Sequence, residues 1–181
     1  MEKEKLKKDL DRILIQISNC DNKASILLAV IGIIVGLTTS AFSSLSFVKN
    51  LINNIIENNT TNIILAVLIS TILLSYLICF IIAFIELILV LIARTESKKY
   101  KKCENKKSLI YFGDITNFPY EEFSKKIDNQ TDNDINEDLK CQIYINAKIC
   151  AKKFKFYNKS VKWVICATIL AIISVIINCL I

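Results

Sequence analysis

Residues Ile63–Ala93 read IILAVLISTILLSYLICFIIAFIELILVLIA, an apolar run in which Glu86 is the only charged side chain. A helix needs about 20 apolar residues to cross a hydrocarbon core of ~30 Å, so this run is long enough to span a membrane. Two further stretches, Ile26–Val48 and Val161–Ile181, meet the same length. The sequence therefore predicts an all-α membrane protein with three transmembrane helices. The mean hydropathy of +0.44 agrees with this class.

The basic residues are distributed unevenly about the three stretches. Of the 23 basic side chains, six lie in residues 1–23, sixteen lie in residues 94–162, and Lys49 alone lies in the first connection. Lys and Arg near the ends of a span favour the cytoplasmic side. We therefore expect a multi-pass protein of the bacterial inner membrane, with the N-terminus in the cytoplasm and the C-terminus outside.

Hydropathy and charge together divide the chain into six segments. The first 24 residues space apolar side chains at helical intervals, and Asn19 and Asp21 offer a break and an N-cap before the first span. We expect the cytoplasmic helices to form a bundle that is continuous with the spans. The segments are a cytoplasmic amphipathic helix (1–24), transmembrane helix 1 (25–48), an outer loop or surface helix (49–62), transmembrane helix 2 with a cytoplasmic extension (63–93), a cytoplasmic insertion (94–160) and transmembrane helix 3 (161–181).

The cytoplasmic insertion contains its own local signals. SLIYFGDI (Ser108–Ile115) is typical of a short ordered turn or strand, and Asn117 can cap a short helix near Pro119. The polar run Asp128–Asp134 predicts an exposed loop. Apolar residues at helical spacing then predict one long helix over Ile135–Lys162 that leads directly into the third span.

Two features of the spans leave alternatives open. Gly32, Gly36 and Ser40 follow one another at one residue per turn, a spacing that lets two helices approach closely. Their partner is either another span of this chain or a second copy in a homo-oligomer. Glu86 lies either just below the hydrocarbon or inside the bilayer, where it would need a partner and would indicate a functional site.

The sequence carries no signal for catalysis. It has no histidine, no Gly-rich phosphate or dinucleotide loop, and no metal-ligand spacing among its seven cysteines. We therefore expect a protein that is not an enzyme and that holds no metal and no cofactor.

Three stretches resemble a known family in their order and spacing. They are NCDNKASILL (Asn19–Leu28), SLIYFGDI followed by Tyr120–Phe123, and DLKCQIYINAKICAKKF (Asp138–Phe154). Together they resemble the transmembrane effectors of Pycsar, the bacterial anti-phage systems that signal with cyclic pyrimidine mononucleotides. The resemblance implies that a paired pyrimidine cyclase makes cyclic CMP or cyclic UMP on infection. The effector then senses the nucleotide through its insertion, impairs inner-membrane integrity and causes abortive infection.

The resemblance also implies a set of ligand-binding residues. Lys153, Lys23 or Arg94 could face the phosphate of a cyclic nucleotide, and Gln142 and Asn146 offer the donors and acceptors that a base edge or ribose requires. Phe112, Tyr111 or Tyr100 could stack on the base. Each residue has a structural alternative, such as a helix cap for Asp21 or a chain turn for Gly113. The resemblance carries over Asp21, Lys23, Phe112, Gly113, Asp114, Gln142, Asn146 and Lys153, and positive charge alone adds Arg94 to the set.

Two other functions remain compatible with the residues. A constitutive small membrane pore or toxin would need no ligand, and a membrane scaffold would bind a protein partner. Nothing in the sequence indicates binding of nucleic acid, and nothing in it decides between cyclic CMP and cyclic UMP.

Overall fold

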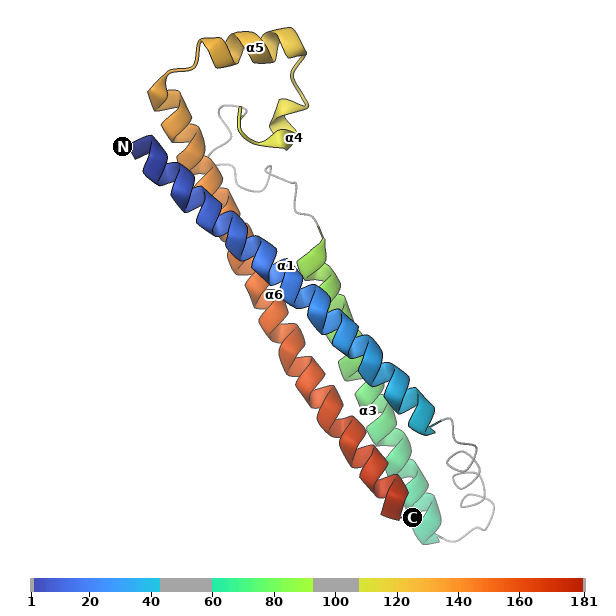
Figure 1. Ribbon diagram of the computed structural model, residues 1–181. Helices are drawn as coiled ribbons and strands as arrows, with labels where there is room; N and C mark the ends of the chain where they lie inside the picture. The colour runs from blue at the N-terminus through green and yellow to red at the C-terminus, as the bar shows by residue number, and fades with distance from the viewer. Residues whose placement is uncertain (1, 43–59, 93–107, 181) are drawn as a thin grey trace. The chain divides into compact units, whose positions relative to one another are not determined.

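The structure is a computed structural model that describes residues 2–42, 60–92 and 108–180 (Figure 1). All regular secondary structure in these ranges is helical, which confirms the predicted all-α class. Three helices are long and apolar enough to cross a membrane, as predicted for the three spans. The helices are α1 (Glu2–Phe42), α3 (Thr60–Leu91), α4 (Phe112–Ile115), α5 (Tyr120–Asp128) and α6 (Asp132–Leu180).

The chain forms two compact units, and α1 and α6 each contribute residues to both. The first unit contains Met1–Asp21 and Ile92–Phe154, and the second contains Asn22–Leu91 and Lys155–Ile181. The predicted continuity of the cytoplasmic helices with the first and third spans is thus present within single helices.

In the second unit, α3 and α6 pack antiparallel. The Sγ atoms of Cys79 and Cys166 lie 3.9 Å apart. About two helical turns further along α3, Glu86 forms an ion pair with Lys159 of α6. Both contacts have the same register, because α3 advances seven residues while α6 steps back seven. Helix α1 joins this packing through the Thr38 hydroxyl, which lies 3.0 Å from the Tyr76 hydroxyl.

Small side chains and one aromatic cluster form the core between these helices. Ala167 and Ala171 let α6 approach Tyr76 and Cys79 of α3 closely, and Trp163 packs against the edge of the cluster. The outer faces of the same helices expose large aliphatic side chains. A helix with an apolar outer face suits a lipid environment, in which the backbone bonds only within the helix.

In the first unit, α1 and α6 run parallel. Lys3 of α1 pairs with Asp132 of α6 at 3.1 Å, and Asp21 of α1 pairs with Lys153 of α6 at 2.6 Å. From the first ion pair to the second, the residue numbers rise on both helices, as they do when two helices run parallel. The chain between Ser108 and Asp132 forms the short helices α4 and α5.

Two local predictions are wrong, and a third is settled between its two alternatives. Helix α1 passes without a break through Asn19 and Asp21, because the Asp21 carboxylate accepts a bond from Lys153 and does not start a new helix. Asn117 does not cap α5: its side-chain amide donates to the Gly113 carbonyl at 2.7 Å, and Pro119 occupies the N-cap position. Of the two alternatives for SLIYFGDI, the structure has the ordered turn and not the strand, and this turn leads into the single helical turn of α4.

The predicted loop at 128–134 is shorter than expected. Helix α5 ends at Asp128 and α6 begins at Asp132, three residues before the predicted start of the long helix. A capping box explains the early start: the Thr131 amide donates to the Asp134 carboxylate, and the Asp134 amide donates to the Thr131 hydroxyl, each at 3.2 Å. The expected surface helix within 49–62 and the candidate residue Arg94 lie outside the described residues, apart from the first turn of α3 at 60–62.

Candidate functional site

The strongest polar contact in the first unit joins Lys153 to Asp21. The Lys153 side chain is 6% exposed and its Nζ donates to Asp21 Oδ1 at 2.6 Å, whereas the Asp21 side chain is 34% exposed. An ammonium group is costly to bury unless it is paired and hydrogen-bonded. The parallel packing of α1 and α6 supplies that partner, so the structure brings together two of the predicted site residues that are 132 positions apart.

Gln142 and Asn146 stand one turn apart on α6. The Asn146 side-chain amide donates to the Gln142 backbone carbonyl at 2.8 Å, which ties Asn146 to its own helix. Gln142 is 6% exposed, and the described part of the chain supplies no hydrogen bond to its side-chain amide. Its side-chain amide offers both a donor and an acceptor to a group that enters this site.

Asp114 has a structural role in the segment that precedes α4. Its Oδ2 accepts a hydrogen bond from the Ser108 backbone amide at 3.0 Å, and the Ser108 hydroxyl accepts from the Ile110 and Tyr111 amides. These bonds close the turn through local backbone donors. The Asp114 carboxylate therefore orders the chain on which Phe112 and Gly113 lie.

Phe112 and Gly113 lie beside the Tyr111 ring. The Phe112 side chain is exposed, and its ring centroid is 4.8 Å from that of Tyr111. A Cβ on Gly113 would lie 2.5 Å from Tyr111 Cε1, so glycine lets the Tyr111 ring lie in this position, and a larger residue would make the ring shift. Burial, and then the negative charge of Asp114, raise the pKa of the Tyr111 phenol above its ordinary value. The exposed Phe112 ring is thus held on an uncharged aromatic support.

Asp138 connects this segment to α6, and it is absent from the set predicted from the sequence. Its Oδ2 accepts a hydrogen bond from the Leu109 backbone amide at 2.9 Å. Asp138 stands one turn before Gln142 and is the first residue of the DLKCQIYINAKICAKKF stretch. Its place at the start of that stretch is the only hint in the sequence, because its partner is a backbone amide.

The remaining candidates are placed less tightly. Lys23 lies in the second unit with an exposed side chain. The structure therefore joins Asp21 to Lys153, links Asn146 to Gln142, and fastens the segment of Phe112, Gly113 and Asp114 to α6 through Asp138. That these residues form one binding site stays a prediction.

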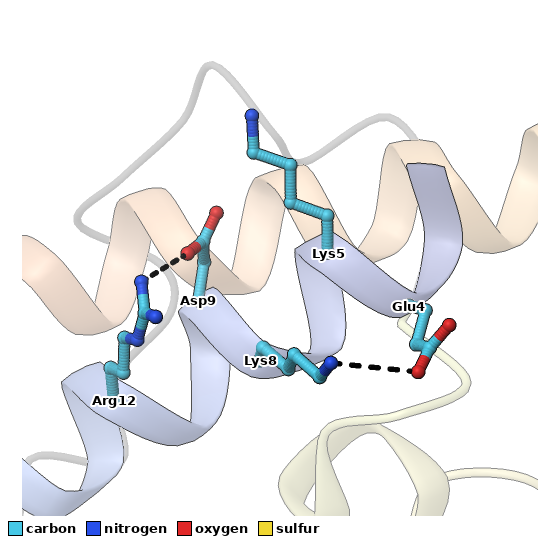
Figure 2. A pocket seen from close by; sticks show the side chains of 5 residues that line it. All are labelled: Glu4, Lys5, Lys8, Asp9 and Arg12. Atoms are coloured by element: carbon cyan, nitrogen blue, oxygen red, sulfur yellow. Dashed lines mark hydrogen bonds and ion pairs between the residues drawn. The ribbon is translucent and has the colours of Figure 1, made fainter. Parts of the chain in front are cut away.

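A surface pocket of about 350 Å³ lies on α1, and none of the candidate site residues lines it (Figure 2). Four of the charged side chains that line this pocket form ion pairs with one another. Lys8 Nζ lies 3.6 Å from Glu4 Oε1, and Arg12 Nη1 lies 3.4 Å from Asp9 Oδ1. Exposed pairs of this kind contribute at most about 1 kcal/mol each, and they leave little net charge for an anion. Within the described ranges, no group of three or more His, Cys, Asp or Glu side chains could hold a metal ion.

Comparison with known proteins gives two consistent matches. Residues 5–179 match the family described as the Pycsar effector protein domain. Pycsar effector protein GmPycTM of Gulbenkiania mobilis is 32% identical over 182 residues, covering 94% of this chain and 90% of that relative. Both descriptions name an effector and neither names a class of enzyme. No solved structure matches the chain.

Proposed function

The chain belongs to the Pycsar effector family, whose members act in anti-phage defence, and we propose that a cyclic pyrimidine mononucleotide activates it. In this proposal, cyclic CMP or cyclic UMP is the product of a paired pyrimidine cyclase. The activated effector impairs inner-membrane integrity, and the infected cell dies in an abortive response.

The buried Lys153 is the observation that carries the proposal. Its ammonium has three donors, and one of them is held by Asp21 at 2.6 Å. A cyclic phosphate offers a negative charge and several acceptor oxygens, so it is the kind of group that can replace a carboxylate at this position. A third of the Asp21 side chain is exposed to solvent, whereas the Lys153 side chain is almost fully buried, so the aspartate is the more accessible end of the pair.

The same face of α6 offers contacts for the rest of the ligand. Gln142 precedes Lys153 by eleven residues, which at 1.5 Å per residue separates their Cα atoms by about 16 Å along the axis. The long lysine side chain leans back toward the N-terminus of the helix and shortens this gap. The Gln142 amide offers a donor and an acceptor that suit the base edge, and the exposed Phe112 ring suits stacking.

The helices that carry the ion pair also carry two of the spans. Asp21 lies on α1 and Lys153 on α6, and each helix continues into residues of the second unit. Exchange of Asp21 for a ligand phosphate would loosen the α1–α6 contact and change how these helices pack in a homo-oligomer. A ligand can drive such a change only by binding one arrangement more tightly than the other. A preference of ~4 kcal/mol would shift the ratio of the two arrangements about a thousandfold.

The proposal is tested with the full-length protein purified in detergent. Cyclic CMP or cyclic UMP should raise its melting temperature, and linear CMP, linear UMP and cyclic AMP should not. Dye-loaded liposomes that contain the protein should leak with the same selectivity among nucleotides. Equal melting temperatures with and without every cyclic nucleotide, together with unchanged leakage, would rule the proposal out.

The two alternative functions, a constitutive pore and a membrane scaffold, predict different results from those of the proposal. A constitutive pore should kill cells that express it without a cyclase. A scaffold should co-purify with a stoichiometric protein partner and show no stabilisation by nucleotide. Expression without the cyclase distinguishes the first of these functions, and the melting experiment distinguishes the second.

A further inference from the structure

Glu86 is the only acidic residue in the three apolar stretches of the sequence. It lies on α3 in the second unit, where its side chain is 8% exposed. The neighbouring Ala83, Leu87 and Val90 on the same helix are fully buried. The carboxylate is therefore fixed in position by a tightly packed stretch of helix.

The two oxygens of this carboxylate have different surroundings. Oε1 accepts a hydrogen bond from the Lys159 ammonium of α6. Oε2 is buried and has no hydrogen-bond partner among the described residues. A buried carboxylate oxygen without a donor is rare, because it loses its hydration and gains nothing in return. One side of the carboxylate thus holds a cationic group and the other side is available to a second one.

Lys159 is the exposed partner of the pair. Its side chain is 55% exposed, against 8% for Glu86. A long lysine side chain can keep its stem on an apolar surface while its ammonium moves into water or the headgroup layer. The ammonium is in effect a tethered monovalent cation that can leave a fixed anionic site.

We propose that Glu86 is a binding site for monovalent cations in the activated protein, and that the Lys159 ammonium occupies this site beforehand. This inference rests on the proposed function, since it concerns the membrane lesion that the activated effector forms. Copies of the chain around an opened path would each contribute one carboxylate, and rings of acidic side chains select for cations. The lesion is therefore a cation-selective pathway.

The test measures ion selectivity in planar bilayers that contain the full-length protein and a KCl gradient, with cyclic CMP or cyclic UMP added. The wild type should show a K⁺/Cl⁻ permeability ratio well above one. Glu86→Gln should lower that ratio about tenfold, which corresponds to ~1.4 kcal/mol, while its nucleotide-induced rise in melting temperature persists. Glu122→Gln, the same substitution at an exposed position of α5, should keep the wild-type ratio.

Lys159→Gln keeps the inference testable if Glu86→Gln is not recovered as a folded protein. With cyclic CMP or cyclic UMP present, it should raise K⁺ flux above that of the wild type and keep the preference for cations, and a flux no higher than that of the wild type would contradict the inference. Wild-type currents without ion preference, or a ratio unchanged by Glu86→Gln, would overturn the inference and leave the proposed function standing. A wild type that stays silent with every cyclic nucleotide would overturn both.

Discussion

Lys153 of α6 donates to Asp21 of α1 across 2.6 Å, and the two ends of this bond are buried to very different degrees. The lysine is almost completely enclosed, whereas a third of the aspartate side chain is exposed. The enclosed cation requires an anionic partner at all times, but that partner need not be Asp21. This asymmetry lets an anionic ligand compete with a side chain for the same ammonium.

Substitutions at the two ends of the bond should affect ligand binding in opposite ways. Lys153→Met removes the cation that receives the phosphate, so cyclic CMP and cyclic UMP should no longer raise the melting temperature. Lys152→Met, at the exposed neighbouring position, is the matched control and should respond as the wild type does. A full response in Lys153→Met would show that this lysine is not the phosphate receptor.

Asp21→Asn should weaken the free protein and strengthen its response to nucleotide. Loss of the carboxylate leaves a buried ammonium with a poorer partner, at a cost of about 1–3 kcal/mol in the free energy of unfolding. The same loss removes the competitor of the phosphate. Calorimetry in detergent should therefore give a lower melting temperature without ligand and a larger rise with it. A smaller rise than in the wild type would contradict the exchange mechanism.

Asp138→Asn should loosen the segment that precedes α4. Its Oδ2 is the acceptor for the Leu109 amide, and an amide side chain offers that donor a weaker acceptor without charge. We expect faster hydrogen exchange at the Leu109 amide, equivalent to a loss of about 1 kcal/mol in local protection. Glu137→Gln, one residue earlier and exposed, should leave this exchange rate unchanged.

Gly113→Ala should displace the Tyr111 ring. The added Cβ would lie 2.5 Å from Tyr111 Cε1, so either the ring or the backbone must shift, at a cost of about 1–3 kcal/mol. Replacing Tyr111 by Ala in the same protein removes the clash, and the double variant should then show less than the sum of the two single losses in stability. Additive losses would mean that the glycine serves another purpose.

The sequence predicts most of the fold because helical spans leave strong local signals. Apolar runs of sufficient length predict α1, α3 and α6, and the Thr131–Asp134 capping box that starts α6 is readable as a threonine followed by an acid three residues later. The break at Asp21 was predicted wrongly because an aspartate between two apolar segments has the same local pattern whether it caps a helix or pairs with a distant lysine.

The candidate site was less predictable for a related reason. Family resemblance identified Asp21 and Lys153 as members of a set, but only packing shows that they contact each other across 132 positions. Asp138 was missed because its partner is a backbone amide. Nearly every residue has a backbone amide, so the sequence does not show which one has a given side chain as its partner. Asn117 was misassigned since a side-chain amide can bond the carbonyl at the end of the preceding helix as well as the amides of the next one.

The glycines of the first span allow a test of self-association. A Cβ at Gly32 or Gly36 would meet no atom within 4 Å in the described part of the chain, so the small residues do not serve the packing of α1 against α3 or α6 there. Of the two partners that the spacing allows, a second copy is then the one to expect. Gly36→Ala should keep the fold, and its better helix propensity is worth about 1 kcal/mol in an exposed helix.

Gly36→Ile is the informative change at this position, because its branched side chain keeps two helix backbones apart. We expect it to lower the oligomeric state of the protein in detergent, measured by light scattering. The melting temperature of the variant should stay close to that of Gly36→Ala. Leu37→Ile, at the exposed neighbouring position, supplies a control of similar chemistry. An oligomer that survives Gly36→Ile intact would place the contact between copies on another face of the spans.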